Sequence, residues 1–275
     1  MSIIAISRGT FSGGELLAKS VAERLGYRCL SRETNLEAAA KQYMVPAEQL
    51  TAAMEKRPAF WERVLGERAA YLTFVQATLC EQARGGKLVY HGYLGQRLLP
   101  GIAHVISVRV IADLEFRIQA AQRQQNLARK DSLAYLEKVD KERRAWTRFL
   151  FEVDWEDPHL YDLVLNLSRM NMATACETVA QLTERAEFQP TPASVKALAD
   201  LTLHSQVTAA LATDFRTRDA ELTVTVDAGM VTITGRSRWP EVANAVPVVV
   251  RQVDGVRGIN CEITGAPPPV PLTWY

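Results

Sequence analysis

Short apolar runs separated by long stretches constrain the fold of this chain more than any other feature. The runs are rich in isoleucine, valine and leucine, and are "IIAI" (3–6), "KLVYHG" (87–92), "HVISVRVIA" (104–112) and "YDLVLNLS" (161–168). Such runs are typical of strands buried on both faces of a parallel sheet, whose neighbouring strands are joined by crossovers of a dozen residues or more. The pattern therefore predicts an α/β domain that binds its ligands at the carboxyl ends of the strands.

Helical periodicity fills the stretches between these runs. Leu17, Val21 and Leu25 recur at helical spacing after the first run, and Gly26 supplies a C-terminal stop. Further helical patterns cover 33–57, 59–84, 113–150 and 171–187, and "YRCL" (27–30) is a candidate second strand. This alternation predicts a three-layer domain with helices on both faces of a parallel sheet.

A proline-containing break at 188–194 separates this pattern from a different one. After a helical segment, apolar and polar residues alternate on both sides of an Asp-Ala-Gly turn in "ELTVTVDAGMVTITGRS" (221–237), which predicts a β-hairpin. A further helix and strand follow. The expected parts of the chain are a first domain (1–189), a small α+β domain (190–265) and a proline-rich extended tail (266–275).

Charge and composition narrow the range of partners. The 275 residues include 32 Lys and Arg against 31 Asp and Glu, a net charge of +1, so no overall basic field favours nucleic-acid binding. The four cysteines are scattered without the spacing of a metal site, and no metal site formed by the protein alone is expected. The sequence shows neither a signal peptide nor an apolar run that could span a bilayer, so we expect a cytoplasmic protein.

The segment "SRGTFSGGELLAKSVAERLGY" (7–27) joins the first apolar run to the first helix. A strand, a glycine-containing turn and a helix N-terminus form the phosphate cradle of P-loop proteins, in which a lysine adds positive charge. If the second glycine of G-x-x-x-x-G-K-[ST] is aligned with Gly13, then Gly14 stands at the lysine position and Glu15 at the Ser/Thr position. From these residues alone, the segment can be interpreted either as a phosphate-binding loop or as a plain strand-to-helix turn.

The segment "IAISRGTFSGGELLAKSVAERLGYRCLSRE" (4–33) resembles the opening of the cytidylate-kinase-like family, whose members are relatives of nucleoside monophosphate kinases. Members typically carry serine-arginine, then a glycine-serine-glycine-glycine turn, then the helix, so the family itself tends to lack the P-loop lysine. The resemblance implies a P-loop kinase-like fold. It also makes Arg8 available to supply the positive charge, because a guanidinium matches phosphate oxygens with two hydrogen bonds.

Later segments extend this resemblance over about residues 1–187. "HVISVRVIADLEFRI" (104–118) resembles the family's fourth strand and the arginine-bearing helix after it, with Arg117 at the arginine. The segment 139–168 is the most specific, because Asp140 and Arg143 match an Asp-x-x-Arg pair that precedes a tryptophan-containing turn.

The resemblance implies transfer of a phosphoryl group from ATP, with Mg²⁺, to a nucleotide or another small acceptor. Positioning and charge neutralisation, which arginines and Mg²⁺ supply, are the main requirements of this reaction. The implied residues are Ser12, Gly13 and Gly14 as the ATP cradle, Arg8, Arg117 and Arg143 as catalytic arginines, and Arg32 and Asp140 on the side of the acceptor substrate. For each arginine of 113–150, the alternative to a catalytic role is a surface ion pair with a neighbouring glutamate.

Several positions depart from the family pattern and support a different function. Phe11 replaces a glycine, Ser31 an aspartate and Tyr93 an arginine, while Glu15 adds a carboxylate beside the phosphate loop. A carboxylate repels an anionic ligand, and a serine cannot act as a general base in place of an aspartate. The alternative is therefore a catalytically degenerate nucleotide-binding or scaffold protein. His91 is interpreted as a wall residue of the cleft.

The order helix, hairpin, helix, strand over 194–264 resembles the BON domain. The matching elements are the hairpin that ends at Gly235 and the Val-Asp-Gly-Val turn at 253–256. The resemblance implies a regulatory module that binds a ligand, a phospholipid or a protein partner. Arg236, Arg238 and Arg251 are candidates for binding an anionic lipid head group, and the alternative is that they form a solvated rim. Nothing else in the sequence supports membrane attachment.

Overall fold

The computed structural model describes residues 1–55, 63–237 and 239–265. Their contacts divide the chain into two units, one up to Leu198 and one from Ala199 on. The boundary predicted near residue 190 lies just before helix α9 (Pro192–Thr213), whereas the division by contacts falls within this helix. The predicted proline-rich tail lies outside the described residues, as do 56–62 of the predicted helical stretches.

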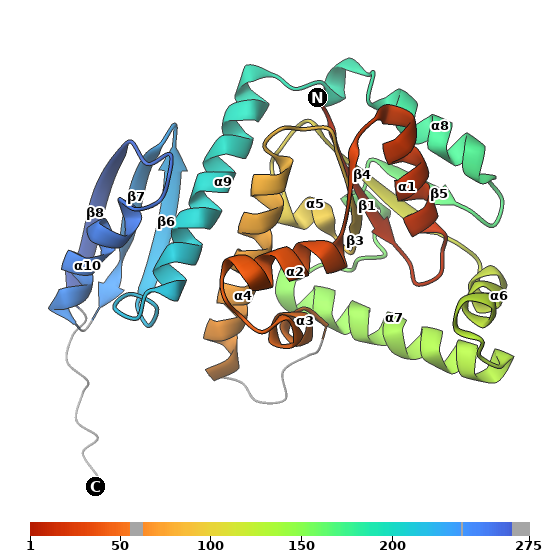
Figure 1. Ribbon diagram of the computed structural model, residues 1–275, viewed down its shortest axis with the longest axis horizontal. Coiled ribbons are helices and arrows are strands. Elements are labelled where there is room, and N and C mark those ends of the chain that lie inside the picture. Colours follow the sequence, from red (N-terminus) through yellow and green to blue (C-terminus); the bar gives the residue numbers. More distant parts are fainter. Residues whose placement is uncertain (56–62, 238, 266–275) are drawn as a thin grey trace, which may run out of the picture. The chain divides into compact units, whose positions relative to one another are not determined.

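A five-stranded parallel sheet forms the centre of the first unit (Figure 1). Its strands in spatial order are β2 (Arg28–Ser31), β3 (Leu88–Gly92), β1 (Ile3–Arg8), β4 (Val105–Ile111) and β5 (Leu163–Asn166). The central strand β1 is apolar without alternation because both of its faces are covered, and Ile3, Ile4 and Ile6 are completely buried. The predicted parallel α/β fold is confirmed.

Helices cover both faces of this sheet and make the three layers (Figure 1). They are α1 (Gly14–Leu25), α2 (Arg32–Gln42), α3 (Ala47–Glu55), α4 (Arg63–Ala83), α5 (Gly95–Leu98), α6 (Leu114–Gln125), α7 (Arg129–Phe151) and α8 (Met172–Leu182), with 3-10 turns at Pro158–Leu160 and Ala186–Phe188. Helices α1 and α8 pack together on one face, where Leu17, Val21 and Val179 contribute to the core, and α4 and α5 lie on the other.

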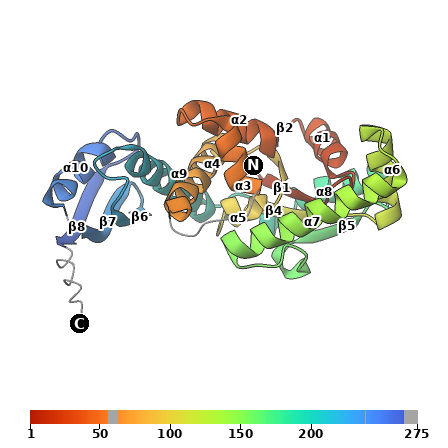
Figure 2. The ribbon, with the colours of Figure 1, turned by 90° about the horizontal axis from the view of Figure 1, so that it is seen from below.

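Two predicted helical stretches are each interrupted by a residue with positive φ. Between α2 and α3, Met44 has φ of 53°, and Pro46 two residues later disfavours helix at the residue before it. Asn126, also with φ of 53°, ends α6 and separates it from α7. Asparagine tolerates this left-handed conformation. As a result α6 folds back on α7, and α7 also packs against α3 (Figure 2).

The second unit is a three-stranded sheet with helices on one of its faces. The elements are the part of α9 from Ala199 on, β6 (Glu221–Asp227), β7 (Met230–Ser237), α10 (Pro240–Val250) and β8 (Gly258–Gly265), with β6 and β7 antiparallel and β8 parallel to β7. Val207, Val231 and Val246 are fully buried between sheet and helices. The hairpin turn uses Ala228 and Gly229 with φ of 48° and 87°, as a two-residue turn requires. The predicted order of elements is confirmed.

Among the described residues, no helix combines the length and the apolar character that crossing a membrane requires.

Candidate functional site

The loop between β1 and α1 forms a tight cradle at the carboxyl edge of the parallel sheet. Gly13, the residue before α1, has φ of 85°, a conformation in which a side chain is strained. A Cβ on Gly14 would lie 2.6 Å from the Cβ of Arg8, so glycine is needed for the chain to turn back onto the end of β1. The first N–H groups of α1 have no partner within the helix. This end of α1 therefore suits an anion.

A cavity of about 830 Å³ opens over this loop, and every residue from Arg8 to Glu15 lines it. Phe116 and Ala120 of α6 and Met172 at the start of α8 give it an apolar side. The charged residues in its wall are Arg8, Glu15, Lys19, Arg32, Glu33, Arg123 and Arg143. Because the cations in this wall outnumber the carboxylates, the cavity favours a negatively charged ligand.

Arg8 ends β1 at the base of the cavity, and 19% of its side chain is exposed. Its Nη2 donates to both carboxylate oxygens of Glu33 at 3.2 Å, and its Nη1 lies 3.8 Å from Oε2 of Glu15. Burial opposes ionisation of Glu33, but its own backbone N–H and then Arg8 and Arg32 outweigh burial and lower its pKa. The positive charge of Arg8 is therefore compensated by two glutamates.

The remaining loop residues divide into those that shape the loop and those that face the cavity. The N–H and hydroxyl of Ser12 both donate to the carbonyl of Gly9, at 3.1 and 2.9 Å, so Ser12 holds the turn. The hydroxyl of Thr10 is buried in the cavity wall and has no hydrogen-bond partner among the described residues. Phe11 has φ of 58°, and its ring centroid lies 6.1 Å from that of Tyr135 on α7. An unpaired buried hydroxyl is costly unless a ligand satisfies it.

Arg117 and Asp140, which sequence reasoning placed in the reaction, contact each other. The Nη2 of Arg117 donates to both oxygens of Asp140 at 2.9 and 2.8 Å, and its Nε donates to the carbonyl of Thr10 at 2.8 Å. Neither residue lines the cavity over the loop. The pair therefore joins α6 and α7 to the loop between β1 and α1.

Arg143, one of the buried residues of α7, reaches the end of β1, and 9% of its surface is exposed. Its Nη2 donates to the hydroxyl of Tyr93 at 2.8 Å, and its Nη1 is 3.4 Å from the carbonyl oxygen of Arg8. Its buried Nε has no hydrogen-bond partner within 1–55, 63–237 and 239–265. Burial lowers the pKa of Arg143, although Tyr93 and Asp140 oppose this shift. In the part of the chain that the structure describes, no carboxylate forms an ion pair with Arg143.

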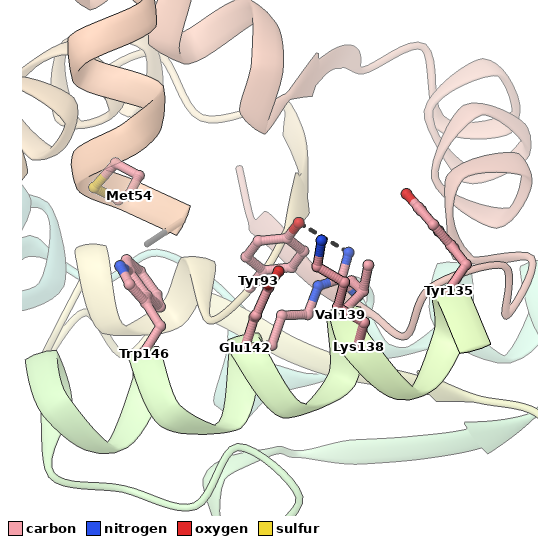
Figure 3. A pocket seen from close by; sticks show the side chains of 8 residues that line it. Met54, Tyr93, Tyr135, Lys138, Val139, Glu142 and Trp146 are labelled. Carbon is pink, nitrogen blue, oxygen red and sulfur yellow. Dashed lines mark hydrogen bonds between the residues drawn. The ribbon is translucent and has the colours of Figure 1, made fainter. Parts of the chain in front are cut away.

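A second pocket of about 280 Å³ adjoins the cavity, and the two share Tyr93, Tyr135 and Arg143. Figure 3 shows Lys138, Glu142 and Trp146 rising from α7, while Met54 enters from α3. The pocket thus combines an indole ring and a thioether with one carboxylate and one ammonium group. It is suited to a small, flat molecule that also carries polar groups.

Comparison with known proteins identifies the family of the first unit. Residues 3–169 match the cytidylate kinase-like family. The chain belongs to this family. Residues 199–267 match the BON domain, in agreement with the three-stranded sheet of the second unit.

Individual related proteins align with about two thirds of this chain. A cytidylate kinase from Ignicoccus hospitalis is 27% identical over 188 residues, which are 66% of this chain and 99% of that protein. An uncharacterized protein from Eubacterium ventriosum has a similar structure, with a TM-score of 0.52 and 22% identity over 67% of this chain and 99% of its own. A shikimate kinase from Bacteroides thetaiotaomicron has a TM-score of 0.42 and 8% identity over 67% of this chain and 99% of its own. The structural similarity concerns the fold alone.

The structure brings together most of the residues that the family resemblance singled out. Those that share the cavity wall are Arg8, Ser12, Gly13, Gly14, Arg32 and Arg143, whereas Arg117 and Asp140 lie behind it. Their roles in a reaction stay predictions. His91, interpreted as a wall residue of the cleft, is 3% exposed but absent from the linings of the cavity and the pocket.

Sequence reasoning did not predict that two residues, Tyr93 and Thr10, contribute to the site. Tyr93 was noted only because it replaces an arginine of the family pattern, and Thr10 was not considered. The usable signal for Tyr93 was its position, because it directly follows the third apolar run, where a parallel sheet places its ligands. Its contacts with two arginines depend on the packing of β3, α2 and α7 and carry no local pattern.

Proposed function

We propose that this family member transfers a phosphoryl group from ATP to a nucleotide, with CMP as the first acceptor to test. The observation that carries the proposal is Arg143, a buried guanidinium that lines both the cavity and the pocket and forms no carboxylate ion pair among the described residues. Burial of an uncompensated cation is costly, and an anion at that place removes the cost. A phosphoryl group that passes between two adjoining sites is such an anion.

The two cavities suit the two substrates. The phosphates of ATP would lie on the first N–H groups of α1 after Gly13 and Gly14, with Arg8 beneath them, and the apolar side of the cavity would receive the base. The acceptor would lie in the 280 Å³ pocket against Trp146, with Glu142 able to accept hydrogen bonds from an amino or hydroxyl group.

The residues around the loop also fit a nucleotide that carries Mg²⁺. Glu15 and Glu33 are the carboxylates of the cavity wall, and the unpartnered hydroxyl of Thr10 is a further oxygen there. Mg²⁺ in nucleotide sites is commonly held by one or two carboxylates together with phosphate oxygens. When bound, the ion would neutralise part of the phosphate charge.

The decisive experiment measures ADP formed from ATP and Mg²⁺ with and without CMP. We expect acceptor-dependent ADP, and Arg143→Ala should lower kcat about 10²-fold, the usual loss when one group that stabilises transition-state charge is removed. Arg144→Ala is the matched control, because Arg144 is the next residue of α7, is 41% exposed and pairs with Glu156. Absence of acceptor-dependent ADP, or an equal loss in the two variants, would reject the proposal.

A nucleotide-binding protein without transferase activity is the second candidate, and the double compensation of Arg8 by Glu33 and Glu15 favours it. Calorimetric titration with ATP and Mg²⁺ separates the two. Binding that weakens in Arg8→Ala, together with no acceptor-dependent ADP for CMP or other nucleoside monophosphates, is the result expected of a binding protein.

We infer that the BON unit binds a ligand or a protein partner, a role supported by its family match. Of the three arginines considered for an anionic head group, Arg236 and Arg251 are exposed and Arg238 lies outside the described residues. Sedimentation of the full chain with anionic liposomes tests the membrane form of this role, and a protein that stays in the supernatant would contradict that form.

A further inference from the structure

The wall of the cavity over the loop contains an anion that belongs to the protein, the carboxylate of Glu33. Glu33 is the second residue of α2, and the hydroxyl of Ser31 caps this helix by accepting the backbone N–H of Thr34 at 3.0 Å. A carboxylate in the first turn of a helix is favoured by the helix dipole. The backbone of Glu33 is therefore fixed, whereas its side chain is 50% exposed and has room to turn toward solvent.

The Glu33 carboxylate lies against Arg8, the last residue of β1. Nη2 of Arg8 donates to both carboxylate oxygens at 3.2 Å, and Nε of Arg32 lies 3.5 Å from Oε1. Nη1 of Arg8 lies 3.8 Å from Oε2 of Glu15, in the first turn of α1. The terminal nitrogens of Arg8 therefore lie between the first turns of α1 and α2, and Glu33 is the closer of the two glutamates.

This pairing uses the part of Arg8 that a phosphate would need. Arg8, Glu15 and Glu33 all line the cavity, while Nε of Arg8 is buried and has no hydrogen-bond partner among the described residues. A phosphate that binds Arg8 through its terminal nitrogens competes with Glu33 for them. The apparent affinity for such an anion is lowered according to the fraction of molecules in which the pair is intact.

The cost of displacing Glu33 depends on what the anion brings with it. A polyphosphate alone leaves the displaced carboxylate close to further negative charge, which is unfavourable. A nucleotide that carries Mg²⁺ offers this carboxylate a new cation, because Mg²⁺ is commonly held by one or two carboxylates together with phosphate oxygens. Glu33 therefore opposes the metal-free form of the ligand and favours the form that carries the ion.

We propose that Glu33 is a specificity-determining residue that holds Arg8 until a nucleotide arrives with a divalent cation, so that the cavity selects metal-bound nucleotides over free polyphosphate anions. The nucleotide as ligand rests on the proposed function, whereas the pairing of Glu33 with Arg8 does not. The compensation of Arg8 is then a means of selecting the ligand and not a loss of anion binding.

The first measurement asks whether the pair exists in solution. The Nε–H signal of Arg8 is recorded for the full chain with ¹⁵N-labelled arginine and is assigned with Arg8→Lys. Glu33→Gln keeps the size of the side chain and removes its charge, so it should move this signal in the absence of any ligand. Glu37→Gln is the matched control and should leave the signal unchanged, because Glu37 lies one turn further along α2, is exposed and does not line this cavity.

Calorimetric titration with ATP then measures the selection, once in EDTA and once with Mg²⁺ in excess over ATP. The wild type should bind ATP about tenfold more weakly in EDTA, which is within the range for two charges in contact near a protein surface. In Glu33→Gln, affinity should rise in EDTA and fall with Mg²⁺, so that the two dissociation constants lie within about threefold of each other. Glu37→Gln should keep the ratio of the wild type.

Three results would overturn the proposal. They are an Arg8 signal that does not respond to Glu33→Gln, a wild type that binds ATP equally in EDTA and with Mg²⁺, and a Glu33→Gln variant that keeps the wild-type ratio. An equal response of Glu37→Gln would indicate a general effect of charge on α2 and would also reject it. The second of these results comes from the wild type and depends on no variant.

The same data separate the role of Glu33 from the reaction. If the selection is found but the assay with ATP and CMP yields no acceptor-dependent ADP, the proposed reaction is rejected and the role of Glu33 stands. If CMP is phosphorylated while Glu33→Gln binds ATP as the wild type does, the role of Glu33 is rejected and the reaction stands.

Discussion

His91 lies at the carboxyl end of β3, and burial, followed by the positive charge of Arg8, lowers its pKa to about 4. Of the charged groups that act on it, Arg8 and Lys19 oppose its protonation, and Glu15 and Glu33 favour it. The imidazole is therefore neutral at pH 7 and adds nothing to the positive charge near the cavity over the loop. Among the described residues its buried Nδ1 has no hydrogen-bond partner, so protonation there would place a cation without an acceptor close to the positive charge of Arg8.

The depressed pKa of His91 predicts a loss of stability in mild acid. Because the histidine binds a proton near pH 6.5 when unfolded but only near pH 4 when folded, the unfolded state gains protons first as the pH falls. Urea unfolding of the wild type should lose about 2 kcal/mol through this group between pH 7.5 and pH 5.0. In His91→Gln this part of the loss should disappear.

Two comparisons keep this result specific to His91. His104 and His204 also have lowered pKa values caused by burial, so the wild type retains some pH dependence in every variant. His159, whose side chain is 91% exposed, is the control, and His159→Gln should keep the slope of the wild type. An unchanged slope in His91→Gln would mean that His91 is protonated in the folded protein near pH 5.

Individual site residues could be predicted from the sequence only where they belong to a local pattern. The loop with Gly13 and Gly14 was predicted because strand, turn and helix follow one another along the chain. The pairing of Arg8 with Glu33 was not, because it forms between β1 and α2, which are 25 residues apart in sequence. Contacts of this kind depend on how the elements pack, and residue spacing in the sequence does not predict them.

At the scale of elements, one ion pair connects α6, α7 and the loop between β1 and α1. Arg117 comes from α6, Asp140 from α7, and the carbonyl of Thr10 from the loop. The two side chains are 14% and 20% exposed, so water screens the pair only partly. Loss of either partner leaves a shielded charge without its counter-charge.

The position of this pair predicts a contribution to stability that surface pairs lack. Arg117→Ala and Asp140→Ala should each lower the unfolding free energy by about 1–3 kcal/mol, and the double variant should lose less than the sum. Arg129→Ala is the control, since Arg129 and Glu115 are 62% and 51% exposed. Its cost should stay below about 1 kcal/mol. Unchanged stability of Arg117→Ala, together with loss of phosphoryl transfer, would instead place Arg117 on the substrate.

The elements themselves were largely predictable from the sequence, and the errors have a common cause. Apolar runs predicted four of the five strands of the first unit, and alternation predicted the hairpin of the second, because burial on one or both faces leaves a recognisable pattern of apolar residues in the sequence. The remaining strand, β2, was a candidate at "YRCL" (27–30). The interruptions at Met44 and Asn126 were missed. Helical periodicity continues across each interruption, and a single residue with positive φ leaves that periodicity intact.

At the scale of the whole molecule, the chain contains two units with separate cores. One core lies around Ile6 and Val108 of the parallel sheet, and the other around Val231 and Val246 of the BON unit. The candidate site is built entirely from residues of the first unit. A ligand stabilises the folded segments that it contacts, so nucleotide should act first on the unit that holds the cavity.

Hydrogen exchange of the full chain with and without ATP and Mg²⁺ tests this expectation. Nucleotide should slow exchange at 8–16, where the loop enters α1, and at Tyr135 and Arg143 of α7, because these residues line the cavity. Exchange in β6, β7 and β8 should stay the same, since their hydrogen bonds belong to the core of the second unit. Arg8→Ala should abolish the slowing in the loop at the same ATP concentration. Slowed exchange within 221–265 would contradict this expectation and would show instead that the BON unit responds to the nucleotide site.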